Sequence, residues 1–291
     1  MQRKTFGTTG IETTILGLGG MPLSIQGRPD RSEGIRVVHA ALDAGMRLID
    51  TADVYCLDDD DIGHNEALIT EALASWSGDA SEVLLCTKGG LTRPDGAWRT
   101  EGNAAHLKAA CDRSLKALGV EQIAVYQFHA PDSDVPFAES IGALKDLRDA
   151  GKVAHVGLSN VSRAELDEAN EIVPIVSVQN RCNPYDLRSF ESGVVDRCEE
   201  LGLAFLPYSP VGGGSGKGRV AEDPTLIDVG RAHDASPFEV ALAWLLTTSD
   251  AMFPIPGASK VRSAESSARA ADLELTEADV RRLDAHHGFR R

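Results

Sequence analysis

The sequence predicts an α/β fold, a (β/α)8 TIM barrel preceded by an N-terminal β-hairpin, and three observations lead to it. Short apolar segments alternate along the chain with amphipathic helical segments, which is the pattern of βα units around a parallel sheet. Most of the apolar segments are continuous runs, as expected for strands that are covered on both faces. The chain has 291 residues, a length that suits one barrel. We therefore expect a single barrel domain over residues 1–291.

The apolar segments provide eight candidate strands for the barrel. They are Ile15–Leu18, Arg47–Asp50, Val83–Thr87, Ile123–Phe128, Ala154–Leu158, Ile175–Gln179, Ala204–Tyr208 and Met252–Ile255. Ahead of the barrel, Thr5–Leu18 contains a turn signal at Thr8-Thr9-Gly10 and predicts a hairpin. We expect this hairpin to close one end of the barrel.

Local start signals support the helices between the strands. Ser236–Glu239 and Ser162–Glu165 each have the form of a capping box, and Asp223-Pro224 combines an N-cap residue with proline at the first helical position. Gly45 follows an apolar stripe at helical spacing and predicts the end of that helix. Val211–Gly218 is rich in glycine and follows a strand, so we expect it to be a flexible loop that wraps a ligand.

Charge and composition exclude several classes of partner. The formal net charge of −15 argues against nucleic acid and anionic membranes, because both require clustered Lys and Arg. No stretch approaches the roughly 20 apolar residues of a membrane-spanning helix, and we expect a cytoplasmic protein. The five cysteines lack metal-ligand spacing, which favours buried or idle thiols in a reducing compartment. The acidic run Asp58–Asp61 is expected to be a solvated loop.

Polar residues at the carboxyl ends of the strands indicate where the chemistry lies, since this is where parallel barrels build their active sites. Asp50, Lys88 and His129 end successive strands, and Tyr55 follows Asp50 closely. Each residue alone has an ordinary structural explanation, as a cap, a surface side chain or a buried histidine. Together, Asp50 holds Lys88, Lys88 lowers the pKa of Tyr55, and His129 orients a substrate carbonyl by a hydrogen bond. This chemistry requires no metal.

From about Phe6 to Leu283, the sequence resembles the aldo-keto reductase family. The resemblance lies in motifs at successive strand ends: Ile49–Tyr55, Leu85–Lys88, Tyr126–Asp132, Gly157–Asn160, Val178–Asn180 and Pro207–Pro210. It implies reduction of an aldehyde or ketone to an alcohol by NADPH, with Tyr55 as general acid and Asp50, Lys88 and His129 completing a tetrad. It also implies an extended cofactor without a Rossmann fold, so the absence of G-x-G-x-x-G is no objection.

The same resemblance implies a set of cofactor contacts. Those near the nicotinamide are Gly20, Met21, Asp50, Ser159, Asn160, Gln179 and Tyr208. Those along the pyrophosphate are Ser209, Pro210, Val211 and Gly212, and those near the adenosine are Gly257, Ala258, Ser259, Lys260, Ser263 and Ser267. Lys260 and Arg262 are available for a 2′-phosphate. The chain departs from the family at Ser263, Ser266 and Ser267, where relatives often carry Arg or Gln followed by Glu-Asn; Ser266 and Ser267 remain able to hydrogen-bond adenine.

Several alternatives remain open. The motifs resemble those of a pyridoxal-reductase-like bacterial branch, and pyridoxal, a sugar aldehyde or a secondary-metabolite ketone is each a candidate substrate. The loop after Lys88 contains Arg93 and Trp98, and Trp98 either walls a ring-shaped substrate or only shields the site from water. The alternative to an enzyme is a non-catalytic NADPH-binding regulatory subunit similar to the potassium-channel β-subunits. An aldolase with Lys88 as a Schiff base leaves Tyr55 and Asp50 unexplained.

Overall fold

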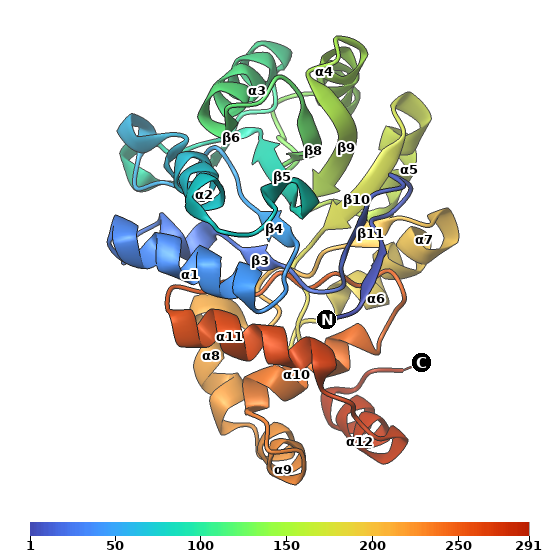
Figure 1. The fold of residues 1–291 in the computed structure, drawn as a ribbon. Coiled ribbons are helices and arrows are strands. Elements are labelled where there is room, and N and C mark those ends of the chain that lie inside the picture. Colours follow the sequence, from blue (N-terminus) through green and yellow to red (C-terminus); the bar gives the residue numbers. More distant parts are fainter. Residues whose placement is uncertain (291) are drawn as a thin grey trace.

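A computed structural model describes residues 1–290 of the chain, so Arg291 and the side chain of Ser215 lie outside the described residues. Seven parallel strands form one curled sheet in the order β11-β10-β9-β8-β5-β4-β3, with helices on its outer side (Figure 1). The strands are β3 (Leu18–Gly19), β4 (Leu48–Asp50), β5 (Leu84–Gly89), β8 (Ile123–Phe128), β9 (Val153–Ser159), β10 (Ile175–Gln179) and β11 (Ala204–Phe205). This arrangement is a (β/α)8 barrel, as the sequence predicts.

The segment predicted as the eighth strand closes the barrel without forming a regular strand. Pro254 and Pro256 lack the N–H groups that a ladder needs. Their carbonyls still accept hydrogen bonds, since Gly17 donates to Pro254 and Gly19 donates to Pro256, both over 3.0 Å. On its other side the segment is bridged to Phe205 of β11. The barrel therefore closes through isolated contacts rather than a continuous ladder.

The N-terminal hairpin closes the amino-terminal end of the barrel, as predicted. It consists of β1 (Arg3–Thr5) and β2 (Glu12–Thr14), paired antiparallel. Phe6 follows β1 and is fully buried in a cluster of side chains that project into the barrel interior. Gly7 has a φ of +53°, and a Cβ at this position would lie 2.1 Å from the carbonyl oxygen of Val176. The close approach of hairpin and barrel therefore requires glycine here.

The helices surround the sheet in chain order (Figure 1). They are α1 (Arg31–Asp43), α2 (His64–Ser75), α3 (Ala104–Leu118), α4 (Phe137–Asp149), α5 (Arg163–Ile172), α6 (Arg188–Glu191), α7 (Val194–Leu201), α8 (Gly213–Glu222), α9 (Pro224–Ala232), α10 (Pro237–Leu246), α11 (Val261–Arg269) and α12 (Glu277–His287). Both predicted capping boxes are present, at Ser162 before α5 and at Ser236 before α10. Asp223 caps α9, and Gly45, with φ +96°, follows the end of α1.

Three predicted segments differ in the structure. The glycine-rich segment is not a flexible loop, because residues from Gly213 onward form α8, where the fully buried Val220 supplies packing that offsets the low helix propensity of glycine. The first barrel strand is Leu18–Gly19 rather than Ile15–Leu18, since the preceding residues belong to the approach from the hairpin. The last regular strand ends at Phe205, two residues before Pro207, which has no N–H to donate.

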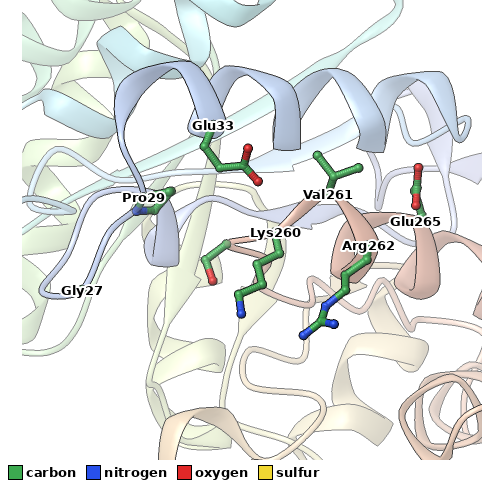
Figure 2. Close-up of a pocket in the computed structure, with 8 residues that line it drawn as sticks. Gly27, Pro29, Glu33, Lys260, Val261, Arg262 and Glu265 are labelled. Atoms are coloured by element: carbon green, nitrogen blue, oxygen red, sulfur yellow. The ribbon is translucent and has the colours of Figure 1, made fainter.

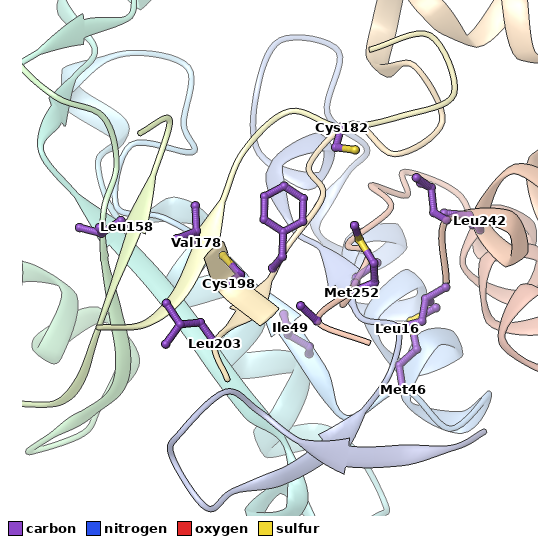
Figure 3. Packing of buried hydrophobic residues seen from close by; sticks show 14 of the residues in the cluster. Leu16, Met46, Ile49, Leu158, Val178, Cys182, Cys198, Leu203, Leu242 and Met252 are labelled. Atoms are coloured by element: carbon purple, nitrogen blue, oxygen red, sulfur yellow. The ribbon is translucent and has the colours of Figure 1, made fainter. Parts of the chain in front are cut away.

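The larger part of the core lies between the sheet and the helices. Figure 3 shows Ile49, Leu158 and Val178 from the sheet packed with side chains from the helices and connecting segments. All five cysteines are buried and unpaired, and Cys182 and Cys198 pack in this core, as expected for idle thiols. Among the described residues, no helix has the length and apolarity needed to cross a membrane.

Candidate active site

Three strand ends and one loop bring the predicted tetrad together. Asp50 ends β4, Lys88 lies in β5, and His129 follows β8 directly. The ammonium nitrogen of Lys88 lies 2.5 Å from Asp50 Oδ1 and donates to the Tyr55 hydroxyl over 2.9 Å and to the Thr51 carbonyl over 2.8 Å. Lys88 is fully buried, and Tyr55 is 7% exposed. The buried ammonium therefore has three oxygen partners, one of which is the phenol.

The second carboxylate oxygen of Asp50 is held by two buried amides. Gln127 donates to Asp50 Oδ2 over 3.0 Å, and Gln179 donates to the same oxygen over 2.8 Å. Gln179 was predicted as a cofactor contact, whereas the structure bonds it to Asp50. Gln127 was not predicted at all, although a lone amide in the otherwise apolar strand β8 was a signal that could have identified it. Both amides therefore hold the Asp50 carboxylate in place, and this carboxylate in turn holds the Lys88 ammonium.

The pKa values in the site follow from burial and from the Lys88–Asp50 pair. Burial lowers the pKa of Lys88, but the charge of Asp50 and the hydrogen bonds to Asp50 and Tyr55 outweigh it, and the pKa is raised. Burial raises the pKa of Tyr55, Lys88 lowers it and Asp50 raises it, so the net pKa is above the usual value of 10.0. Lys88 therefore lowers the pKa of Tyr55, as the sequence predicts, and burial raises it by more. Tyr55 remains a protonated phenol at neutral pH.

His129 stands beside the phenol as a neutral imidazole. Its ring centre lies 5.8 Å from that of Tyr55, and the two rings are nearly perpendicular. Burial, followed by the charge of Lys88, holds the pKa of His129 well below its usual value. Its Nδ1 has no hydrogen-bond partner among the described residues. A neutral imidazole at this position can donate a hydrogen bond to a carbonyl oxygen that approaches the phenol.

The loop after Lys88 places an aromatic side chain against the tetrad. It contains the short antiparallel pair β6 (Leu91–Thr92) and β7 (Arg99–Thr100). The Trp98 ring lies 6.3 Å from that of Tyr55 and 6.5 Å from that of His129. Trp98 is 46% exposed, which is unusual for so large an apolar side chain. It is therefore in a position to contact a molecule bound at the tetrad.

Several residues predicted near the nicotinamide lie around the same strand ends. Asn160 donates to the backbone carbonyl of His129 over 2.9 Å and to Ser159 Oγ over 3.1 Å, and it accepts from the Tyr208 hydroxyl over 2.8 Å. Asn160 has a φ of +59°, a left-handed conformation that asparagine tolerates better than most residues. Gly20 donates its N–H to the Asp50 carbonyl over 2.8 Å. The structure thus brings these predicted residues to one end of the barrel.

The segment predicted to follow the pyrophosphate leads into the amino terminus of α8. Ser209 and Gly212 both have positive φ values, +51° and +88°. The N-cap residue of α8 is Gly212, which has no side chain to cap the first turn. Uncapped N–H groups at a helix amino terminus are suited to an anion such as a pyrophosphate. In this respect the residues present suit a dinucleotide.

The predicted adenosine end is a pocket of about 620 Å³ between α1 and α11. Its lining is Gly27, Pro29, Glu33, Ser259, Lys260, Val261, Arg262 and Glu265. Figure 2 shows the charged ends of Lys260 and Arg262 pointing to the same side, away from α1. Glu33 is paired with Arg36 over 2.6 Å, which reduces its repulsion of a phosphate. Two cations on one side of the pocket suit a phosphate group.

The other residues predicted to contact the adenosine do not line this pocket. Ser263 and Ser267 are half-buried on α11, outside the residues that line the pocket. Ser266 donates to Glu239 over 2.9 Å and is therefore already engaged. Gly257 is bridged to Gly19, which places it in the barrel wall.

The acidic run is more ordered than a solvated loop. Asp58 caps a short 3-10 helix, Asp61 pairs with Arg28 over 2.5 Å, and Asp59 accepts from the backbone N–H of Arg93 over 2.8 Å. Asp59 and Asp60 are exposed, so the expectation of solvation holds for half of the run. Asp58 and Asp61 are only partly exposed, and with Asp59 their contacts hold the loop that carries Tyr55.

A second pair of buried acids lies behind the tetrad and was not predicted. Asp53 and Glu66 are both fully buried. Thr87 donates to Glu66 over 2.5 Å, while the Arg113 guanidinium lies 3.8 Å from the carboxylate of Asp53, whose two oxygens accept no hydrogen bond of standard geometry within residues 1–290. Burial raises the pKa of Glu66 to about 7, and burial together with the charge of Glu66 raises that of Asp53 further above its usual value. Nothing in the sequence distinguishes these acids from exposed ones, because their partners come from other elements.

Comparison with known proteins agrees with the geometry. The aldo/keto reductase family model matches residues 15–287. "Probable aldo-keto reductase 1" of Glycine max is 32% identical over 97% of this chain and 88% of its own length. An uncharacterized oxidoreductase of Schizosaccharomyces pombe is 32% identical over 92% of this chain and 85% of its own length.

A solved structure supports the same assignment. The thermostable aldo-keto reductase Tm1743, in complex with the inhibitor epalrestat, superposes with a TM-score of 0.83 at 26% identity, and the match covers 98% of this chain and 99% of that one. Family match, relatives and fold therefore agree over nearly the whole chain. The chain belongs to the aldo/keto reductase family and is an NAD(P)H-dependent oxidoreductase, in a family whose chemistry is the reduction of small-molecule carbonyl compounds.

Proposed function

We propose that this protein reduces an aldehyde or ketone to an alcohol with NADPH, with Tyr55 as the proton donor. The observation that carries the proposal is the contact of the Lys88 ammonium with both the Tyr55 hydroxyl, at 2.9 Å, and Asp50, at 2.5 Å. A buried ammonium beside a phenol stabilises the phenolate that remains after the proton has left. This arrangement suits a general acid that donates its proton and later regains one.

The residues divide the work of the reaction. When bound, the reduced nicotinamide supplies a hydride to the carbonyl carbon. The Tyr55 hydroxyl donates its proton to the carbonyl oxygen, which completes the alcohol. His129 orients that oxygen with a hydrogen bond, and Lys88, held by Asp50, stabilises the Tyr55 phenolate until it regains a proton from water.

The cofactor is held along the carboxyl ends of the strands. Ser159, Asn160 and Gln179 hold the carboxamide, Tyr208 stacks on the nicotinamide ring, and Gly20 and Met21 lie beneath it. Residues Ser209–Gly212 follow the pyrophosphate, and the positive φ values of Ser209 and Gly212 and the glycine N-cap of α8 support this role. Gly257–Lys260 with Ser263 and Ser267 surround the adenosine.

Preference for NADPH over NADH rests on Lys260 and Arg262. We expect the double variant Lys260→Gln, Arg262→Gln to bind NADPH more weakly, by on the order of tenfold, because each substitution removes a charge-assisted contact with the 2′-phosphate. Binding of NADH stays nearly unchanged. Fluorescence titration with both cofactors measures this, with Lys116→Gln, an exposed lysine at the far end of α3, as the matched control. Equal weakening of both cofactors contradicts the 2′-phosphate role.

Turnover of a substrate panel tests the proposed activity. Wild-type protein is mixed with NADPH and a set of aldehydes and ketones that includes pyridoxal, and cofactor oxidation is followed by ultraviolet absorbance. We expect at least one substrate to be reduced. Tight NADPH binding without turnover on the panel favours the regulatory-subunit alternative instead. The five buried, unpaired cysteines support placing the enzyme in the reducing environment of the cytoplasm.

A further inference from the structure

The loop between β5 and α3 presents an aromatic ring that rests on a buried cation. Trp98 is 46% exposed, whereas Arg93 is fully buried. The guanidinium carbon of Arg93 lies 3.8 Å from the centre of the Trp98 ring. One face of the indole is therefore covered by the guanidinium, and the exposed part of the ring, here called its open face, is accessible to a bound molecule.

Arg93 also holds the chain immediately after Tyr55. Its Nη2 donates to the carbonyls of Cys56 over 3.1 Å and Leu57 over 3.2 Å, and to Gln26 Oε1 over 3.2 Å. Its Nε and Nη1 have no hydrogen-bond partner among the described residues, and the acceptors of its Nη2 are all neutral carbonyl oxygens. The buried charge is thus stabilised by carbonyl oxygens and by the indole face rather than by an acid.

These contacts join two loops across the site. The backbone N–H of Arg93 donates to Asp59 over 2.8 Å, so both its backbone and its side chain are tied to the loop that carries Tyr55. Trp98 in turn contacts the rings of Tyr55 and His129 edge to face. The position of the indole relative to the phenol is therefore set through Arg93.

We propose that Trp98, supported by Arg93, is a platform on which planar conjugated carbonyl compounds stack, and that Arg93 is the positioning residue that fixes it. The proposal rests on the proposed reductase function. An aromatic aldehyde has its ring coplanar with its carbonyl, so stacking on the open face of Trp98 directs the carbonyl oxygen toward Tyr55 and His129. A small aliphatic aldehyde offers no ring to stack and gains nothing from the platform.

Two substrates and four variants test the proposal. Benzaldehyde and propanal are compared in wild type, Trp98→Ala, Arg93→Met, the double variant and the control Arg99→Met, which removes an exposed cation next to Trp98. For Trp98→Ala and Arg93→Met we expect KM for benzaldehyde to rise roughly tenfold, the value of a lost aromatic contact with part of its buried area. For propanal, KM stays within about twofold in both variants, and any fall in kcat is the same for the two substrates, because Arg93 also holds the loop that carries Tyr55. Arg99→Met behaves as wild type.

The double variant distinguishes positioning from general damage. If Arg93 acts through Trp98, KM for benzaldehyde rises no further in the double variant than in Trp98→Ala alone, because the two effects are not additive. Equal rises in KM for benzaldehyde and propanal, or additive rises in KM for benzaldehyde in the double variant, overturn the proposal. If Arg93→Met does not fold, Arg93→Lys replaces it, and a benzaldehyde KM equal to that of wild type then counts against the proposal, since lysine lacks the planar group that stacks. Failure of the wild type to turn over either substrate is a failure of the reductase function instead.

Discussion

Lys88 connects the tetrad because it is the side chain that contacts both Asp50 and Tyr55. A lysine that is fully buried retains its charge only where nearby oxygens compensate the lost hydration. Asp50 and the Thr51 carbonyl do so, and Gln127 and Gln179 in turn hold the carboxylate. The sequence allowed the tetrad to be predicted, since its members end successive strands. The lone amide of Gln127 in the otherwise apolar β8 marks it as a candidate, but its bond to Asp50 could not be predicted, because that partner lies on another strand.

Glu66 gives a stability prediction at the same scale. Its pKa is raised by burial from the usual 4.5 to about 7. Between these two values the folded state binds a proton that the unfolded state does not, so the contribution of Glu66 to stability is favourable at low pH and is lost as the pH rises through about 7. Glu66→Gln imitates the protonated form.

We expect Glu66→Gln to be more stable than wild type above about pH 7, by roughly 2 kcal/mol at pH 9, and close to wild type near pH 5. Chemical denaturation across this pH range measures the difference in the free energy of unfolding. Glu121→Gln, at an exposed glutamate, is the control and shows no such trend. A Glu66→Gln difference that is independent of pH contradicts the raised pKa.

At the scale of elements, most of what could be predicted depended on local signals. The capping boxes of α5 and α10 and the cap of α9 are formed by residues three or fewer positions apart, so they are visible in the sequence. The helix α8 was missed for the opposite reason. Its glycines favour a loop, and only tertiary packing of Val220 stabilises the helix.

The N-terminal hairpin gives a prediction for an element that closes the barrel. Phe6 is fully buried among interior side chains, so Phe6→Ala leaves a cavity at the closed end and is expected to cost about 3–5 kcal/mol of unfolding free energy. Ile11→Ala in the same hairpin, at a half-buried position, costs about 1 kcal/mol. Urea denaturation of both variants measures the two values. Equal small costs indicate that the hairpin does not plug the barrel.

For the whole molecule, the barrel explains how residues far apart in the sequence form one site. Parallel strands end on the same side, so Asp50, Lys88 and His129 meet without any local signal between them. Eight barrel positions are predictable from the sequence, whereas the barrel sheet of residues 1–290 has seven regular strands, because Pro254 and Pro256 in the closing segment have no N–H to donate to a ladder. The eighth position is occupied as expected: the carbonyls of Pro254 and Pro256 accept hydrogen bonds on one side, and Phe253 donates its N–H to Phe205 on the other.

The most direct test of the central claim is the comparison of Tyr55→Phe with wild type in both turnover and NADPH binding. The phenol acts in the transition state, so we expect turnover to fall by roughly a hundredfold or more while the dissociation constant for NADPH stays nearly unchanged. Far-ultraviolet circular dichroism confirms that the variant is folded. Turnover of Tyr55→Phe at the wild-type rate would contradict the assignment of Tyr55 as the proton donor.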